Sequence, residues 1–173
     1  MYQMFVYVEG NYDKMFVKNI LSDYLRTNKS ILLYPIPYAQ KPPNEMNKDI
    51  KSKSKHNYLF LSDLDIDKFP CITSRKEKRI NTYEGLESSK IIIVKAEIES
   101  WYLAGVDNTL SQFKNFDIPD NTESVTKEEF DSMIGECSKF DMLMEISKCY
   151  DFKLARKRNS SFNYFMNKIS NYF

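Results

Sequence analysis

Four short runs of apolar residues lie in the first hundred positions of the chain, and each predicts a buried strand. The runs cover residues 4–8, 30–38, 58–61 and 90–96. Unbroken apolar runs of this length are typical of parallel strands, which are buried on both faces. After the first run, apolar residues recur at helical spacing through residues 11–25. The pattern predicts an α/β fold with a mainly parallel four-stranded sheet flanked by helices.

The pattern changes after Gly105, where a polar, linker-like stretch is followed by helical periodicity. Thr126 opens the sequence TKEE, in which a glutamate three residues later completes a capping box and marks the start of a helix. Further helical residues are predicted at positions 128–150, with a break near Gly135, and from Ser160 or Ser161 onward.

Polar segments connect the predicted strands. Residues 39–57 are rich in Pro, Lys and Ser and predict a long loop or a short helix, and residues 74–86 predict a helix or a loop. We expect residues 1–105 to form the α/β core. Residues 106–173 would form a helical C-terminal extension packed on the same domain.

The composition of the 173-residue chain favours a globular protein of the cytoplasm. Hydrophobic residues make up 42%, which is enough to bury a core, and no apolar run approaches the length of a membrane span. The three cysteines are scattered without a CxxC pair, which suits a reducing compartment. The first residues follow a strand pattern without a basic region, so we expect no signal peptide and no membrane association.

The formal net charge is only +1, but the charges are unevenly distributed. Basic clusters occupy residues 48–56, 74–79 and 153–158, and acidic residues gather near positions 63–67 and 97–99. Acidic clusters within basic surroundings suit a metal site that accepts a polyanion. For any single basic run, a solvated loop or helix face is the favoured interpretation.

Acidic side chains follow three of the four predicted strands. They are Glu9, Asp63, Asp65, Asp67, Glu97 and Glu99. Ligands of parallel α/β sheets bind at the carboxyl ends of the strands, so these acids are expected to meet at one edge. Asp67 is equally typical of a turn.

Carboxylates that converge in this way repel one another unless a cation lies among them. Oxygen donors without nearby His or Cys favour a hard ion, Mg²⁺ or Mn²⁺. In an extended segment Asp63 and Asp65 would point to the same side, because strand side chains alternate. Gly10 would let the backbone approach a ligand closely at a tight turn.

Three segments in this order resemble the Toprim domain. They are VEGNYDKMFV (residues 8–17), FLSDLDID (residues 60–67) and AEIESWYLAG (residues 96–105). The combination of Glu-Gly, DxD and ExE followed by Trp is most similar to the nuclease branch found in OLD-like and phage-defence proteins. The resemblance covers about two-thirds of the chain. It implies a Toprim-like Rossmannoid fold.

The resemblance also implies roles for single residues. The matching positions are Glu9, Asp13, Asp63, Asp65, Glu97 and Glu99. Glu9 matches a glutamate that acts in acid/base chemistry or binds metal, and the two aspartates of the DxD match metal ligands. Glu97 and Glu99 match an ExE where a second metal binds. Asp13 matches an acidic position after the Glu-Gly turn, although it also suits the first turn of a helix.

The expected function is therefore a Mg²⁺-dependent (or Mn²⁺-dependent) nuclease in phage defence or DNA repair, with Glu9, Asp63 and Asp65 as catalytic residues. Its expected partner is nucleic acid, either DNA or RNA. The sequence contains no GxxxxGK[ST] motif, so any ATPase that the system needs would be a separate protein.

Two other functions fit the same residues. The segment DLDID is similar to the start of haloacid-dehalogenase phosphatases, with Asp63 as the nucleophile, although that motif normally ends the first strand. The chain could also be a non-catalytic Toprim module that binds nucleic acid or a partner ATPase.

Overall fold

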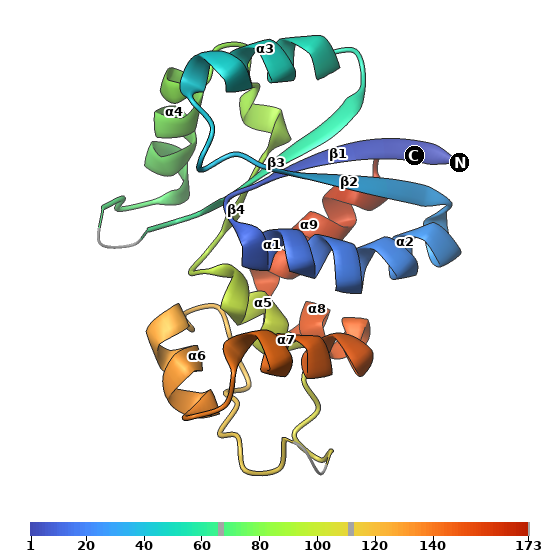
Figure 1. The fold of residues 1–173 in the computed structure, drawn as a ribbon, viewed down its shortest axis with the longest axis vertical. Helices are drawn as coiled ribbons and strands as arrows, with labels where there is room; N and C mark the ends of the chain where they lie inside the picture. The colour runs from blue at the N-terminus through green and yellow to red at the C-terminus, as the bar shows by residue number, and fades with distance from the viewer. Residues whose placement is uncertain (66–67, 111–112, 173) are drawn as a thin grey trace. The chain divides into compact units, whose positions relative to one another are not determined.

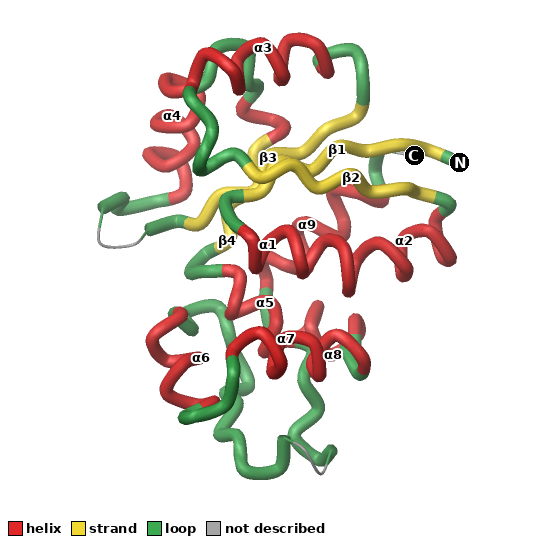
Figure 2. Tube along the Cα trace, in the orientation of Figure 1, coloured by secondary structure: helices red, strands yellow, loops and turns green. Residues whose placement is uncertain are grey.

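Four parallel strands form one sheet in the order β2-β1-β3-β4. The computed structural model describes residues 1–65, 68–110 and 113–172. The strands are β1 (Tyr2–Val8), β2 (Ile31–Pro37), β3 (Asn57–Asp63) and β4 (Ile91–Val94), coloured yellow in Figure 2. The predicted α/β class, with a parallel four-stranded sheet and a helical C-terminal part, is confirmed.

Helices cover both faces of this sheet (Figure 1). One helical connection runs from β1 to β2 and consists of α1 (Asn11–Phe16), the π-helical turn η1 (Val17–Leu21) and α2 (Ser22–Lys29). The opposite face carries α3 (Pro43–Lys53) and α4 (Ile72–Thr82), and the 3₁₀ turn η2 (Ser88–Lys90) leads into β4.

Alternating side chains of β1 divide the core between the two faces. Tyr7 packs in a buried cluster with Met46 and Ile50 of α3 and with Phe60 of β3. Val6, its neighbour in the strand, is also fully buried, and side chains alternate across a strand, so Val6 faces the opposite side. Burial on both faces explains why these strands appear in the sequence as unbroken apolar runs.

The connection between β2 and β3 is more regular than its composition indicates. Residues 39–57, expected as a long loop or a short helix, contain the eleven-residue helix α3, which starts after Pro42. Proline is favoured in the first helical turn because its missing N–H has no intrahelical acceptor there. Pro35 lies within β2 opposite Val6, and this position is tolerated because β2 is an edge strand.

Residues 95–171 form a second, helical unit, whereas Met1–Val94 and Tyr172 belong to the first unit. Its helices are α5 (Ile98–Ala104), α6 (Lys127–Ile134), α7 (Lys139–Lys148), α8 (Phe152–Arg158) and α9 (Ser160–Ser170). The unit therefore begins at residue 95, eleven residues before the expected start at residue 106. The physical reason is that α5 contacts α6, α7 and α8.

A fully buried tryptophan lies in the core of the second unit. Trp101 of α5 packs against Phe162 and Phe165 of α9, with ring centroids 5.4 and 5.1 Å apart. Its indole N–H donates to the hydroxyl of Ser161 at 2.9 Å. The predicted capping box is present at the start of α6, and Gly135, with φ of 58°, ends that helix.

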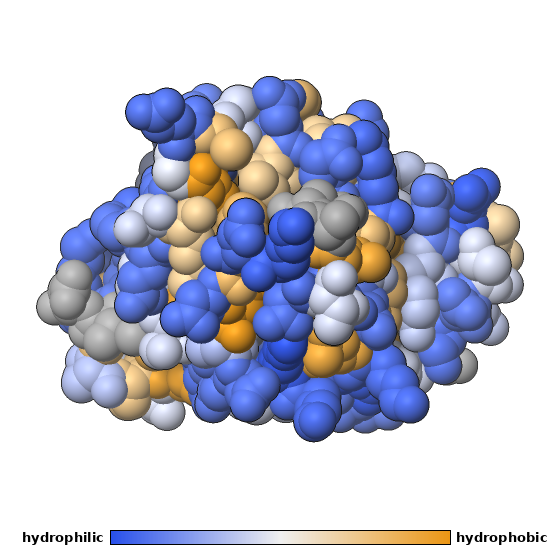
Figure 3. All heavy atoms as spheres, turned by 90° about the horizontal axis from the view of Figure 1, so that it is seen from below, coloured by the Kyte–Doolittle hydropathy of each residue, from blue (hydrophilic) through white to orange (hydrophobic). Residues whose placement is uncertain are grey.

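The surface drawn in Figure 3 is mainly hydrophilic, with small apolar groups between polar side chains. Across the described ranges, no helix has the length and apolar character needed to cross a membrane.

Candidate functional site

The first acidic side chain of the candidate site follows β1 directly. Glu9 is half-buried, and its Oε2 atom lies 3.0 Å from Nη2 of Arg79 and 3.7 Å from Nη2 of Arg75. The hydroxyl of Tyr38, the residue after β2, lies within hydrogen-bond distance of two acceptors, the same oxygen at 3.2 Å and the carbonyl of Leu61 at 3.0 Å. The carboxylate of Glu9 is therefore fixed by contacts with Tyr38, which follows β2, and with two arginines of α4 (Ile72–Thr82).

Asp13 serves the start of α1. Its Oδ2 atom accepts a hydrogen bond from the backbone N–H of Gly10 at 3.1 Å, and its side chain is buried. This contact completes the N-terminal cap of the helix. Gly10 itself has an extended backbone with φ of −135°, and a Cβ there would meet Asp13 only at 3.6 Å. The turn therefore does not require glycine for space.

The end of β3 supplies the next two acids, but in different backbone conformations. Asp63 is the last residue of the strand, and its backbone carbonyl accepts from Nε of Arg75 at 2.7 Å. Asp65 has a left-handed backbone with φ of 52°, and its Oδ2 atom lies 2.8 Å from Nη2 of Arg75. The expectation of an extended stretch through both residues is wrong at Asp65. Asp67 lies outside the described residues.

Two arginines of α4, one helical turn apart, connect these acids. Arg75 is only 4% exposed, and its guanidinium also stacks over the ring of Phe69 at 4.7 Å. The Nε atoms of Arg75 and Arg79 donate to the hydroxyl of Ser62, at 3.2 and 2.8 Å. Ser62 is buried in β3, so the strand fixes both guanidinium groups at its carboxyl end.

Burial and charge tune the polar groups around Glu9. Burial, followed by the negative charge of Glu9, raises the pKa of Tyr38 well above its ordinary value, so the phenol stays a donor. Burial lowers the pKa of Arg79, but Tyr38 and Glu9 outweigh burial, and the net pKa is raised. Arg79 therefore remains a cation.

Glu97 and Glu99 belong to the second unit, where both meet lysines. Glu97 directly precedes α5, its carboxylate accepts from the backbone N–H of Lys127 at the start of α6, and its Oε1 atom lies 3.6 Å from Nζ of Lys127. Glu99 is 5% exposed, and its Oε1 atom lies 2.9 Å from Nζ of Lys139, which also pairs with Asp131 at 2.8 Å. These contacts join α5 to the starts of α6 and α7.

The structure brings Glu9 and Asp65 together, because both carboxylates contact the same nitrogen, Nη2 of Arg75. Within the described ranges, no three acidic, His or Cys side chains are grouped as a metal site. Two carboxylates can still suit Mg²⁺, which commonly takes one or two and completes its shell with water and phosphate oxygens. The carboxylate oxygens of Glu9 and Asp65 are donors of the kind that Mg²⁺ prefers. In this structure they contact the guanidinium of Arg75 instead.

Sequence reasoning missed Arg75, Arg79, Ser62 and Tyr38 as parts of the site. A signal for the arginines was present, because they lie four residues apart in SRKEKR and so share one helix face. That segment was interpreted only as a basic run. Nothing in the local sequence distinguishes Ser62 or Tyr38 from ordinary strand residues.

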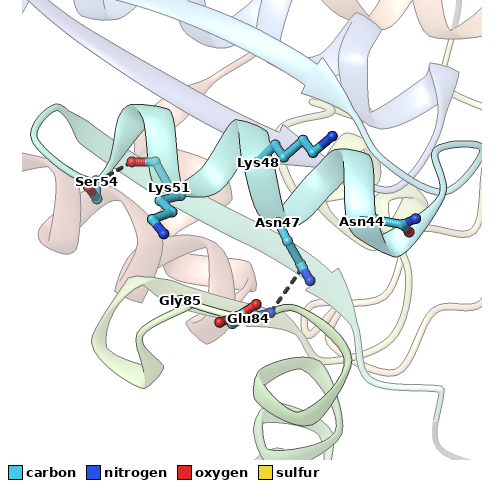
Figure 4. Close-up of a pocket in the computed structure, with 7 residues that line it drawn as sticks. All are labelled: Asn44, Asn47, Lys48, Lys51, Ser54, Glu84 and Gly85. Carbon is cyan, nitrogen blue, oxygen red and sulfur yellow. Dashed lines mark hydrogen bonds between the residues drawn. The ribbon is translucent and has the colours of Figure 1, made fainter.

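A separate hollow of about 440 Å³ lies between α3 and the turn at Glu84 and Gly85 (Figure 4). Its lining residues are Asn44, Asn47, Lys48, Lys51, Ser54, Glu84 and Gly85. The side chains of Asn47 and Lys51 extend toward the turn, and Oδ1 of Asn47 accepts from the N–H of Glu84 at 2.9 Å. Apart from Gly85, the lining residues are of polar or charged types, and Lys48 and Lys51 come from α3.

No family model, curated protein or solved structure matches this chain.

Proposed function

We propose that this chain is a Mg²⁺-dependent nuclease of the Toprim type that hydrolyses phosphodiester bonds of nucleic acid in the cytoplasm. One observation supports the proposal above all others. Glu9 after β1 and Asp65 after β3 approach a common cationic nitrogen at the carboxyl edge of a parallel sheet. That edge is where parallel α/β sheets bind their ligands.

The residues that would hold Mg²⁺ are Glu9, Asp63 and Asp65. When bound, the ion supplies Lewis-acid stabilisation of phosphate charge and a water of lowered pKa. Tyr38 and Arg79 orient the carboxylate of Glu9 through contacts of 3.2 and 3.0 Å. The guanidinium groups on α4 add positive charge at the edge where an anionic backbone would be bound.

The second metal position at Glu97 and Glu99 is a proposal from the sequence alone. Lys127 and Lys139 already neutralise these carboxylates in the second unit. Any metal bound there would have to replace the lysine contacts. A separate ATPase partner and a role in phage defence or DNA repair belong to the same proposal, through the resemblance.

The direct test is cleavage of plasmid DNA and structured RNA by the purified chain with Mg²⁺ or Mn²⁺, and then with EDTA. Glu9→Gln and Asp65→Asn should each lower the cleavage rate on the order of 100-fold, as expected when one key electrostatic group is lost. Glu45→Gln is the matched control, because that side chain is 60% exposed on α3. Absence of both cleavage and metal binding in the wild-type chain would refute the proposal.

A specific observation favours one alternative, a non-catalytic module that binds nucleic acid or a partner ATPase. Glu9 and Asp65 already have arginine partners, so the fold neutralises their charge without a metal. Binding of nucleic acid without cleavage, unchanged in the Asp65→Asn variant, would support this alternative.

A further inference from the structure

Arg75 makes two distinct sets of contacts from a buried position. Its Nε atom donates to the carbonyl of Asp63 at 2.7 Å and to the hydroxyl of Ser62 at 3.2 Å. Its Nη2 atom instead contacts the carboxylates, at 2.8 Å from Asp65 and 3.7 Å from Glu9. One side of the guanidinium is thus anchored to β3, and the other side neutralises the acids.

A divalent ion and this guanidinium compete for the same oxygens. A carboxylate lone pair that accepts an N–H cannot also coordinate a metal. A divalent ion bound to these oxygens would also lie next to the guanidinium of Arg75, and the two positive charges would repel each other. The geometry therefore predicts that metal binding displaces the Nη2 contacts of Arg75.

We propose that Arg75 is a built-in counter-ion that occupies the cation position between Glu9 and Asp65 and closes the metal site until a divalent ion replaces it. This inference rests on the proposed function, because it assumes that the two carboxylates bind metal. It adds an autoinhibitory contact that no motif in the sequence indicates.

The anchored half of the side chain makes the exchange feasible. Loss of the Nη2 contacts leaves the Nε contacts with Ser62 and Asp63 in place. The ring of Phe69, at 4.7 Å, continues to cover the guanidinium. The arginine that releases the carboxylates therefore keeps two hydrogen-bond acceptors and the aromatic contact.

The test is the affinity of the full chain for Mn²⁺ alone, measured by calorimetry and by the electron paramagnetic resonance signal of free Mn²⁺. Arg75→Gln should bind Mn²⁺ on the order of 10-fold more tightly than the wild type, because the competing charge-assisted contact is removed. Arg75→Lys keeps the charge but loses the planar fork and should fall between the two.

Arg26→Gln is the matched control, because Arg26 pairs with Asp23 on α2 and its side chain is 57% exposed. Its Mn²⁺ affinity should equal that of the wild type. Thermal melting supplies a second measurement. Metal-free Arg75→Gln should melt at a lower temperature than the metal-free wild type. Mn²⁺ should raise the melting temperature of Arg75→Gln by more than it raises that of the wild type.

The outcomes separate this inference from the proposed function. If the wild type binds Mn²⁺ and cleaves nucleic acid while both Arg75 variants bind Mn²⁺ with unchanged or weaker affinity, the counter-ion role is wrong and the nuclease proposal stands. If neither the wild type nor any variant binds Mn²⁺, both proposals are wrong. Tighter binding in Arg75→Gln but not in Arg26→Gln supports the counter-ion role.

Discussion

Tyr38 positions the carboxylate of Glu9 from the end of the neighbouring strand. Removing its hydroxyl in Tyr38→Phe leaves the carbonyl of Leu61 without this donor, and the ring still stacks on Phe60 at 4.3 Å. We expect the free energy of unfolding to fall by about 1–2 kcal/mol in urea titrations, the typical cost of one buried hydrogen bond. Tyr34→Phe, at a 40% exposed position, should change it little. Equal effects of the two changes would contradict a stabilising buried hydrogen bond from the Tyr38 hydroxyl.

Asp49 gives the first unit a specific response to acid. Burial alone raises the pKa of Asp49, but hydrogen bonds from Lys53 and Tyr7 outweigh it, and the net pKa lies below the ordinary value of 3.8. A lowered folded-state pKa stabilises the fold fully above 3.8, and this contribution is lost as the pH falls through the folded-state pKa.

The corresponding prediction compares urea unfolding of the wild type and Asp49→Asn from pH 7 down to pH 2. We expect the variant to be less stable at pH 7 and to lose less stability on acidification, because the titrating carboxylate is gone. Asp23→Asn, whose side chain is 81% exposed, should follow the wild-type curve. A parallel pair of curves for Asp49→Asn and the wild type would show that Asp49 is not the acid-sensitive group.

Single-residue reasoning from the sequence identified the acids of the candidate site better than their neutralising partners. Glu9 and Asp65 follow strands, and strand ends can be read from apolar runs. Arg75 looks like any solvated cation in SRKEKR until the helix buries it to 4% exposure. The left-handed conformation of Asp65 was also missed, although aspartate adopts positive φ more often than most residues.

At the scale of elements, strands were the most predictable part of the chain. Each observed strand overlaps an apolar run, because a parallel strand is buried on both faces and leaves a strong signal. Helix α3 was harder to predict because its residues are mainly polar, with only Met46 and Ile50 buried. Periodicity carries little information when an element contributes two side chains to the core.

The capping box of α6 permits a prediction at this scale. The hydroxyl of Thr126 accepts from the N–H of Glu129 at 3.3 Å, and the N–H of Thr126 donates to Oε2 of Glu129 at 2.9 Å. Thr126→Ala should lower the free energy of unfolding by about 1 kcal/mol in chemical denaturation, the usual cost of losing such a cap. Thr27→Ala, at an exposed position inside α2, should leave stability unchanged or slightly increased. The same loss at both positions would exclude a capping contribution.

At the scale of the whole molecule, the sequence predicted an α/β part and a helical part but placed their boundary eleven residues late. Glu97 and Glu99 follow β4 and therefore appeared to belong to its edge of the sheet. In the structure they begin the second unit, where Lys127 and Lys139 neutralise them. Local patterns could not reveal these lysines, because they lie 30 and 40 positions further along the chain.

A net charge of +1 gives the whole molecule no strong field for a polyanion, so nucleic-acid binding must depend on local basic surfaces. Lys51 of α3 lines the hollow beside Glu84 and Gly85 and extends toward that turn (Figure 4). If the proposed nuclease binds its substrate there, Lys51→Gln should weaken binding about equally for all sequences. It should also reduce the slope of log K against log salt concentration by about 1, as expected for one lost phosphate contact.

Fluorescence anisotropy with a labelled duplex at several salt concentrations measures both the affinity and the slope. Lys18→Gln is the control, because Lys18 is exposed on η1. Each phosphate contact releases counterions whatever the base sequence. An unchanged slope for Lys51→Gln would therefore exclude the hollow as a site of phosphate contact.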